Sequence, residues 1–163
     1  MIIRKILLSL TLVTTLLTLA ACKTMTKAPV ANLTQLEIRQ LQTRLYDTTD
    51  LIAGLKATAA ALQDEGFIIS NVNETIGIIT GQKVYMLTQS NKVTENASAS
   101  VALKDNQISI RLNLASEEFY DGDGGWGIPR TEAHPIYDPA IYEKLFSKVD
   151  KSLFLRKENI SVQ

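Results

Sequence analysis

The most unusual stretch with a potential for chemistry is the acidic, glycine-rich segment at residues 121–127, whose sequence is Asp-Gly-Asp-Gly-Gly-Trp-Gly. Alternating carboxylates are typical of a calcium-binding loop, and Glu132 is the twelfth residue of an EF-hand-like frame that begins at Asp121. The frame has glycine at its fifth position and tryptophan at its sixth, where an oxygen ligand and the turn glycine belong. Asp121, Asp123 and Glu132 therefore make a partial calcium motif, and the alternative is a metal-free loop with solvated aspartates.

Trp126 lies in the middle of this segment. A tryptophan in a loop either packs its ring against the rest of the fold or presents it to a partner. Both interpretations stay open at this point, and Trp126 is a candidate contact residue.

Motifs for catalysis are missing from the sequence. His134 is the single histidine and has no second histidine or cysteine at metal-ligand spacing, so we expect an ordinary surface residue. The chain has no GxSxG nucleophile motif and no phosphate-binding glycine loop. Adjacent carboxylates, such as Glu117 and Glu118, are typical of a solvated face. The sequence therefore predicts a protein that is not an enzyme and that carries no cofactor.

Cys22, the only cysteine, follows a segment typical of a signal peptide. Arg4 and Lys5 precede an uncharged apolar run at residues 6–21, which is a few residues short of the roughly 20 that cross a bilayer. The sequence Leu-Ala-Ala-Cys that ends at Cys22 resembles the bacterial lipobox. The resemblance implies that the thiol receives diacylglycerol, that the leader is removed and that the new amino terminus is acylated, which anchors the chain to a membrane.

Lys23 gives an expectation about which membrane this is. In Gram-negative lipoproteins, an aspartate directly after the lipidated cysteine retains the protein in the inner membrane. Lys23 at this position therefore implies the outer membrane, with the domain expected on the periplasmic side. The leader carries two basic residues and no acidic one, which leaves 15 basic against 17 acidic residues in the mature chain. This balance argues against a nucleic-acid partner.

Three parts are predicted along the chain. Residues 1–21 are the signal peptide, residues 22–34 the lipidated amino terminus and a flexible tether, and residues 35–163 a single α+β domain. About 120 residues suffice for one domain with one core and are too few for two.

Hydrophobic spacing within the domain predicts the order strand, helix, four strands, helix. The elements are expected at residues 36–46 (a strand that changes face), 51–66 (helix), 67–72 and 76–80 (hairpin), 97–103 and 108–114 (hairpin) and 138–153 (helix), while 84–96 is ambiguous. This order favours an antiparallel sheet of about five strands with both helices packed on one face.

The second hairpin has the clearest strand pattern, because its apolar residues alternate strictly with others. One face of the hairpin is therefore expected to be buried, and the other to be wet or covered by a partner. Ser109, Arg111 and Asn113 lie on that second face and are candidate partner contacts, as is Trp126.

Three short stretches and the end of the chain carry a family resemblance. They are residues 43–47 (Thr-Arg-Leu-Tyr-Asp), 62–67 (Leu-Gln-Asp-Glu-Gly-Phe), 77–79 (Gly-Ile-Ile) and the apolar residues of 142–155. With these, the chain resembles a group of small proteobacterial outer-membrane lipoproteins of unassigned function. More distantly, a helix that ends in glycine and leads into a hairpin is similar to the domains of BamC, an accessory lipoprotein of the outer-membrane β-barrel assembly machine. The resemblance implies an accessory, non-catalytic role.

These observations lead to the hypothesis of a non-enzymatic, lipid-anchored scaffold that docks onto an outer-membrane assembly, transport or secretion complex of the cell envelope. The alternative is a stand-alone ligand- or inhibitor-binding periplasmic lipoprotein, with a pocket between helix and sheet lined by Tyr46, Tyr85 and Tyr120. A hydrolase is a third hypothesis, for which the sequence identifies no paired catalytic acids.

Overall fold

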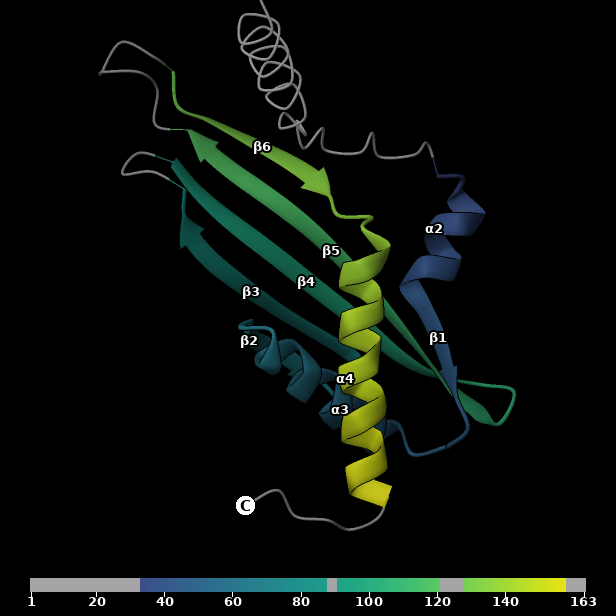
Figure 1. Ribbon diagram of the computed structural model, residues 1–163. Helices are drawn as coiled ribbons and strands as arrows, with labels where there is room; N and C mark the ends of the chain where they lie inside the picture. The colour runs from purple at the N-terminus through teal and green to yellow at the C-terminus, as the bar shows by residue number, and fades with distance from the viewer. Residues whose placement is uncertain (1–32, 88–90, 121–127, 158–163) are drawn as a thin grey trace, which may run out of the picture.

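The computed structural model describes residues 33–87, 91–120 and 128–157 (Figure 1). These residues form an α+β fold with a six-stranded antiparallel sheet and three helices, which confirms the predicted fold class. In chain order the elements are α2 (Gln35–Gln42), β1 (Thr43–Tyr46), α3 (Leu51–Asp64), β2 (Ile68–Asn73), β3 (Ile78–Met86), β4 (Asn91–Lys104), β5 (Gln107–Tyr120), β6 (Arg130–Pro135) and α4 (Pro139–Lys157).

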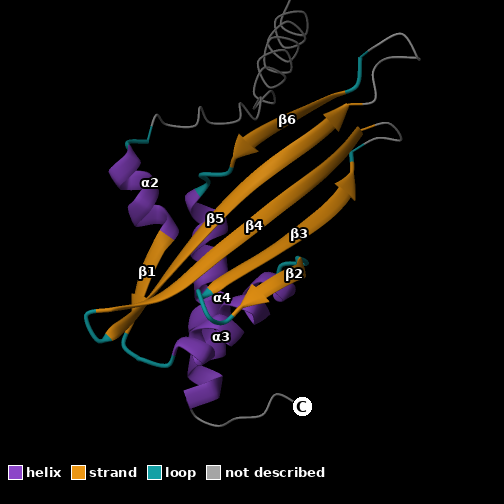
Figure 2. Ribbon diagram, turned by 180° about the vertical axis from the view of Figure 1, so that it is seen from behind, coloured by secondary structure: helices purple, strands orange, loops and turns teal. Residues whose placement is uncertain are grey.

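The sheet has the strand order β1-β5-β4-β3-β2, with β6 also paired to β5 (Figure 2). Along its whole length β5 pairs with β4 on one edge. On its other edge β5 pairs first with β1, over residues 108–111, and then with β6, over residues 115–120. The two short strands therefore leave a notch opposite residues 112–114.

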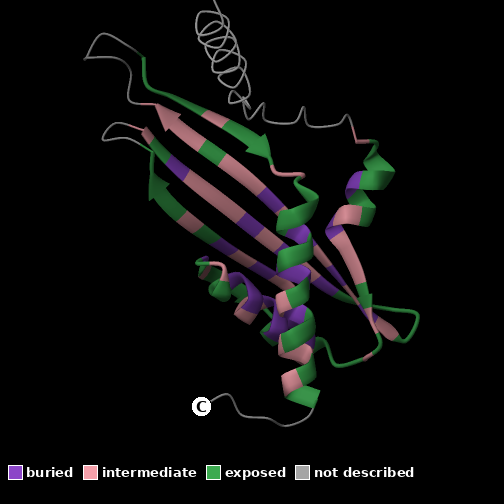
Figure 3. Cartoon of the chain, in the orientation of Figure 1, coloured by how far each residue is buried: buried purple, intermediate pink, exposed green. Residues whose placement is uncertain are grey.

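The core lies between one face of the sheet and the helices α3 and α4, which both cover that face (Figures 1 and 2). Buried residues alternate with less buried ones along β4 and β5, as expected for strands with one covered face (Figure 3). The cross-strand pairs of the buried face are Ala97 with Leu114, Ala99 with Leu112, and Val101 with Ile110.

Both long helices begin at capped ends. The carboxylate of Asp50 accepts a hydrogen bond from the backbone N–H of Ala53 at 2.8 Å, and that of Asp138 accepts one from Ala140 at 2.9 Å. Pro139 occupies the first turn of α4, as predicted. From α4 the buried residues Tyr142, Leu145, Phe146 and Val149 pack into the core.

The first predicted element is wrong over most of its length. The strand expected at residues 36–46 is a helix, α2, followed by a four-residue strand. A capping box starts the helix, because the hydroxyl of Thr34 accepts from the N–H of Glu37 and the Glu37 carboxylate accepts from the N–H of Thr34. Ile38 is buried and Leu41 half-buried, at helical spacing. The two hairpins and the other two helices lie where they were predicted.

The sheet is also larger than predicted. The ambiguous residues 84–96 contain the end of β3 and the start of β4, so the central strands are longer than expected. A sixth strand, β6, pairs with the distal half of β5. In the described ranges, no helix is long and apolar enough to cross a membrane.

Glu65 links the two long helices at the end of α3. Its carboxylate lies 2.9 Å from the Nζ of Lys144 and 2.5 Å from that of Lys148. Desolvation opposes ionisation of Glu65, but the hydrogen bonds and charges of the two lysines outweigh it and hold the pKa of the carboxyl below its ordinary value.

We predict that Glu65→Gln destabilises the protein at neutral pH by on the order of 1 kcal/mol, since the pair is partly exposed to solvent. Because the folded-state pKa lies below the unfolded one, this stabilisation is complete above the unfolded value of about 4.3 and is lost as pH falls through the folded one. Urea unfolding across pH should show the difference from wild type shrinking in acid. Glu143→Gln, on exposed α4 surface, is the matched control. A difference that does not change with pH would contradict this assignment.

Gly77 allows a close approach between the β2–β3 turn and β4. Its φ is +68°, and a Cβ there would lie 2.1 Å from the carbonyl oxygen of Val101. The N–H of Val101 donates to the carbonyl of Gly77 at 2.8 Å, so neither backbone can move away without losing this bond.

Gly77→Ala should therefore lower the free energy of unfolding by roughly 3 kcal/mol, more than a left-handed conformation alone costs. Gly66→Ala is the matched control, because Gly66 also has a positive φ (+86°) but its Cβ would meet only the side chain of Lys83, at 3.4 Å. We expect a loss of about 1 to 2 kcal/mol for the control. Equal losses in urea titrations of the two variants would show that the contact with Val101 does not matter.

Candidate binding site

Most of the candidate site residues named from the sequence lie outside the described residues. These are Cys22, Lys23, Asp121, Asp123 and Trp126.

Glu132 is the one candidate calcium ligand that the structure describes. It lies in β6, where its carboxylate is 3.1 Å from the Nε of Arg130 and 3.8 Å from the Nε2 of His134. Over the described ranges, no three side chains of histidine, cysteine, aspartate or glutamate come together as a metal site would require. The described structure thus brings no further ligand to Glu132.

Ser109, Arg111 and Asn113 share the face of the sheet opposite α3 and α4, which we call the open face. Their partners in register on β4 are Ala102, Ser100 and Ser98. The residues between them, Ile108, Ile110, Leu112 and Leu114, are buried under the helices. The prediction that these three side chains lie on one face is confirmed.

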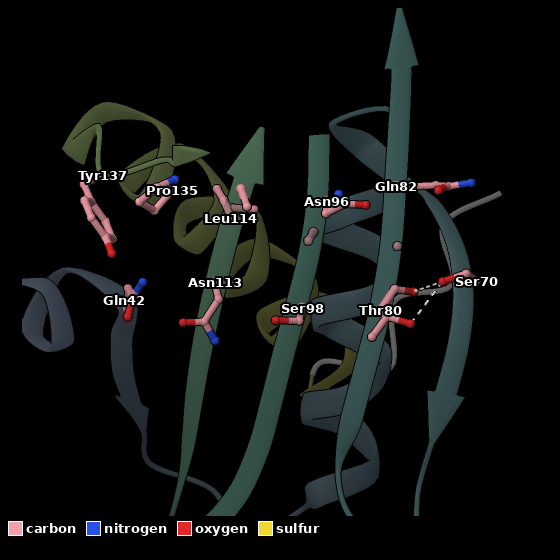
Figure 4. Close-up of a pocket in the computed structure, with 13 residues that line it drawn as sticks. Gln42, Ser70, Thr80, Gln82, Asn96, Ser98, Asn113, Leu114, Pro135 and Tyr137 are labelled. Carbon is pink, nitrogen blue, oxygen red and sulfur yellow. Dashed lines mark hydrogen bonds between the residues drawn. The ribbon is translucent and has the colours of Figure 1, made fainter. Parts of the chain in front are cut away.

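The open face is hollowed at its centre, over a volume of about 440 Å³ (Figure 4). Side chains from β2, β3, β4, β5 and the segments around α2 and β6 surround this hollow. The lining residues are Gln42, Ser70, Thr80, Gly81, Gln82, Asn96, Ala97, Ser98, Asn113, Leu114, Ala115, Pro135 and Tyr137. In Figure 4 the helices lie behind the sheet, so the hollow is not the space between helix and sheet.

Short side chains in register produce the hollow. One row across the sheet consists of Thr80, Ser98 and Asn113, and the next row includes Asn96 and Ala115. Because all of these point to the same side of a pleated sheet, their small size leaves a depression between the strands at either edge. The right-handed twist of a sheet adds to its concavity.

Gln42 closes the notch between β1 and β6 at one edge of the hollow (Figure 4). It is only 4% exposed although it is polar, and its side-chain oxygen accepts a hydrogen bond from Arg111 at 3.2 Å. The Nε of Arg111 is buried with no hydrogen-bond partner in the described part of the chain. Gln42 therefore holds the Arg111 guanidinium at the edge of the hollow.

Tyr137 stands at the same edge, after β6 ends. The N–H of Ile136 donates to the carbonyl of Leu114 at 2.9 Å, which continues the pairing with β5 by one residue. The hydroxyl of Tyr142, reaching from α4, donates to the carbonyl of Ile136 at 2.9 Å. These two bonds fix the backbone beside Tyr137, so its ring is held at the rim.

The hollow is lined by neutral hydrogen-bonding groups and by apolar side chains, those of Ala97, Leu114 and Pro135 among them. None of its lining residues carries a charge at neutral pH. The hydroxyl of Ser70 bonds to that of Thr80 at 3.0 Å. Asn96, Ser98 and Asn113 make no side-chain hydrogen bond to any described residue, so their amides and hydroxyl are available to a ligand. Neutral amides and hydroxyls can bind and orient a ligand but supply no strong base or nucleophile.

The predicted pocket lined by three tyrosines is wrong. Tyr46 pairs with Ile108, near the start of β5, whereas Tyr120 ends that strand, about 40 Å away at 3.4 Å per residue. Tyr85 lies at the same end as Tyr120 but donates to Glu95 at 3.1 Å. The alternation of apolar residues predicted which residues share a face of the sheet. It did not predict how far the helices extend along the strands.

Tyr46 instead borders a second hollow, of about 400 Å³, between the start of α3 and the end of α4. Burial raises the pKa of its hydroxyl, the negative charge of Asp150 adds to this effect, and Arg44 opposes it. The hydroxyl therefore stays protonated at neutral pH.

Gln42→Leu should lower the free energy of unfolding by roughly 1 to 3 kcal/mol, because it leaves the partly buried Arg111 guanidinium without this acceptor. Gln82→Leu is the matched control, since Gln82 lines the same hollow but is exposed and forms no hydrogen bond with the described residues. Thermal unfolding of both variants measures the difference. If Gln42→Leu were as stable as the control, the bond to Arg111 would not contribute to the stability of the fold.

Comparison with known proteins leaves the chain without a family assignment. No protein-family model matches it, and no curated protein matches it either. The resemblance to small outer-membrane lipoproteins stays a hypothesis drawn from the sequence.

Proposed function

We propose that this protein is a non-enzymatic, lipid-anchored accessory protein of the cell envelope, which acts as a scaffold for an outer-membrane assembly, transport or secretion complex. The open face carries this proposal. Its hollow of about 440 Å³ is lined by uncharged residues, among them polar side chains such as those of Ser98 and Asn113 that take no part in the core, and neither α3 nor α4 covers this face (Figure 2). A sheet face with free amides and hydroxyls is suited to receiving a partner.

The sequence before the domain supplies the other half of the proposal. Cys22 and Lys23 are expected to place a lipid at an outer membrane, and about ten residues then lead to α2, which starts at Gln35. A short tether keeps the domain at high effective concentration near the membrane, so a weak contact through the open face suffices. The proposed mechanism is therefore retention at the membrane combined with docking.

The chemistry of the described surface fits docking better than catalysis. Ser98 is the central hydroxyl of the hollow, and its neighbours in register are Thr80 and Asn113, neither of which is a base. His134 pairs in register with Ser116, on the helix side of the sheet, and interacts with Glu132. It is therefore not available to activate Ser98.

A second candidate function is stand-alone binding of a small ligand by a periplasmic lipoprotein. The volume of the hollow favours it, since small-molecule sites typically measure about 300 to 1,000 Å³. A purified protein whose melting temperature rises with a small envelope metabolite, with no complex recovered from cells, would favour this function over a scaffold.

To test the scaffold, tagged full-length protein is cross-linked in intact cells and purified in mild detergent. Ser98→Trp places a large ring in the hollow without touching the core, and should lower recovery of envelope components about tenfold, which corresponds to 1.4 kcal/mol of binding free energy. Ser147→Trp, on the exposed side of α4, is the matched control and should recover them like wild type. Cys22→Ala should leave the membrane fraction or remain unprocessed.

Two results would overturn the proposal. Equal recovery of envelope components by the Ser98→Trp and wild-type proteins would show that the open face is not the docking surface. Normal processing and membrane retention of Cys22→Ala would remove the lipid anchor.

A further inference from the structure

We infer that the hollow on the open face binds a neutral saccharide chain. The inference rests on the proposed scaffold function and names the chemistry of the envelope component that the open face holds. It follows from three properties of the lining: its charge, the spacing of its hydrogen-bonding groups and its one aromatic rim residue.

The charge of the lining selects a neutral ligand. All thirteen lining residues are uncharged. The nearest basic group in the next row of the open face, the guanidinium of Arg111, is turned to Gln42, to which it donates at 3.2 Å. An anionic ligand such as a nucleic acid or a phosphate headgroup would find no cation in the lining to compensate its desolvation.

The hydrogen-bonding groups are arranged as a row across the strands. Thr80, Ser98 and Asn113 are direct neighbours in register on β3, β4 and β5. Adjacent strands are about 4.8 Å apart, so the row presents one donor or acceptor at each such step. A chain of sugar rings carries hydroxyls that both donate and accept along its length, and it can meet the row when it lies across the strands.

The polar side chains of the hollow and the hydroxyls of a sugar can each both donate and accept hydrogen bonds. The amides of Asn96 and Asn113 each offer a donor and an acceptor, and they form no bonds with the described residues. The hydroxyl of Ser98 does the same. Sugar hydroxyls need partners of this kind, because a hydroxyl left unpaired on burial loses its hydrogen bonds to water without replacement.

The apolar parts of the lining suit the C–H face of a sugar ring. The ring of Tyr137 lies at the rim with Pro135 beside it (Figure 4), and Ala115, which pairs in register with Pro135, also belongs to the lining. An aromatic ring with a polar tip can pack against the apolar face of a sugar while bonding to a hydroxyl. The small side chains of the lining form no deep apolar pocket for a large side chain, so within the docking surface the hollow itself suits a sugar ring.

The test is calorimetric titration of the full-length lipidated protein in a polyoxyethylene detergent, which has no sugar headgroup to compete. The probes are maltohexaose, cellohexaose and N-acetylchitohexaose, with hexagalacturonate as the charged comparator. At least one neutral hexaose should bind saturably at millimolar concentration, and the charged one should bind at least tenfold more weakly.

Asn113→Ala and Tyr137→Leu should each weaken binding about tenfold, the loss expected for one hydrogen bond or one ring contact. Ser147→Ala is the matched control, because it removes a hydroxyl from the exposed side of α4, away from the hollow, and it should bind like wild type. Unchanged melting temperatures would show that the losses are not due to unfolding.

The inference is overturned if none of the three neutral hexaoses binds saturably, if hexagalacturonate binds as tightly, or if Ser147→Ala loses as much affinity as Asn113→Ala. These failures are distinguishable from failure of the scaffold. If Ser98→Trp loses envelope components but the wild-type protein binds no saccharide, the scaffold proposal stands and the saccharide inference is wrong.

Discussion

The register of the β4–β5 hairpin is the constraint on which the rest of the structure depends. The hairpin turns at Asp105 and Asn106, which both have positive φ (48° and 63°), the conformation of the two-residue turn that matches the twist of antiparallel strands. This turn pairs Lys104 with Gln107 and fixes every pair beyond it. A slip of one residue would send the apolar residues of one strand to the outer face. The register that places the apolar residues in the core therefore also places Ser98 in one row with its neighbours on the open face.

The helices are held on one side by contacts that do not reach the open face. Glu65 joins α3 to α4 through two lysines. At the other edge of the sheet, Arg44 of β1 lies 3.1 Å from the carboxylate of Asp150 and 4.8 Å from the centre of the Phe146 ring, both on α4. With the middle turns of α4 held from both edges of the sheet, most of the open face is left to side chains outside the core. A scaffold benefits from this division, because its docking surface can be occupied without disturbing its stability.

The sequence predicted the parts of the fold in which one periodicity dominates. Strict alternation placed Arg111 and Asn113 on one face, and a cap followed by helical spacing placed α3. Residues 36–46 failed because their apolar spacing fits a strand with a change of face as well as a helix, and only the pair of Thr34 and Glu37 distinguished the two. Strand β6, Arg130–Pro135, was not predicted because neither of its faces is buried in a way that produces an alternating pattern. It pairs with the part of β5 that extends beyond β1.

The hollow was less accessible to sequence reasoning than the fold. Asn113 was named as a contact, but Gln42, Thr80 and Tyr137 come from three other segments, and only the strand order brings them to one surface. The polar residue Gln42 at the end of an amphipathic segment gives no sign that it is buried. Such sites depend on register between distant strands, which no local pattern reports.

The most direct test of the central claim, that the open face is the working surface of a membrane-held domain, is site-specific photocross-linking in living cells. A photoreactive amino acid is placed singly at Ser98 on the open face and at Ser147 on the exposed side of α4. The account predicts adducts to envelope components from position 98 and few or none from position 147. Equal adducts from both positions, or adducts from position 147 alone, would contradict it.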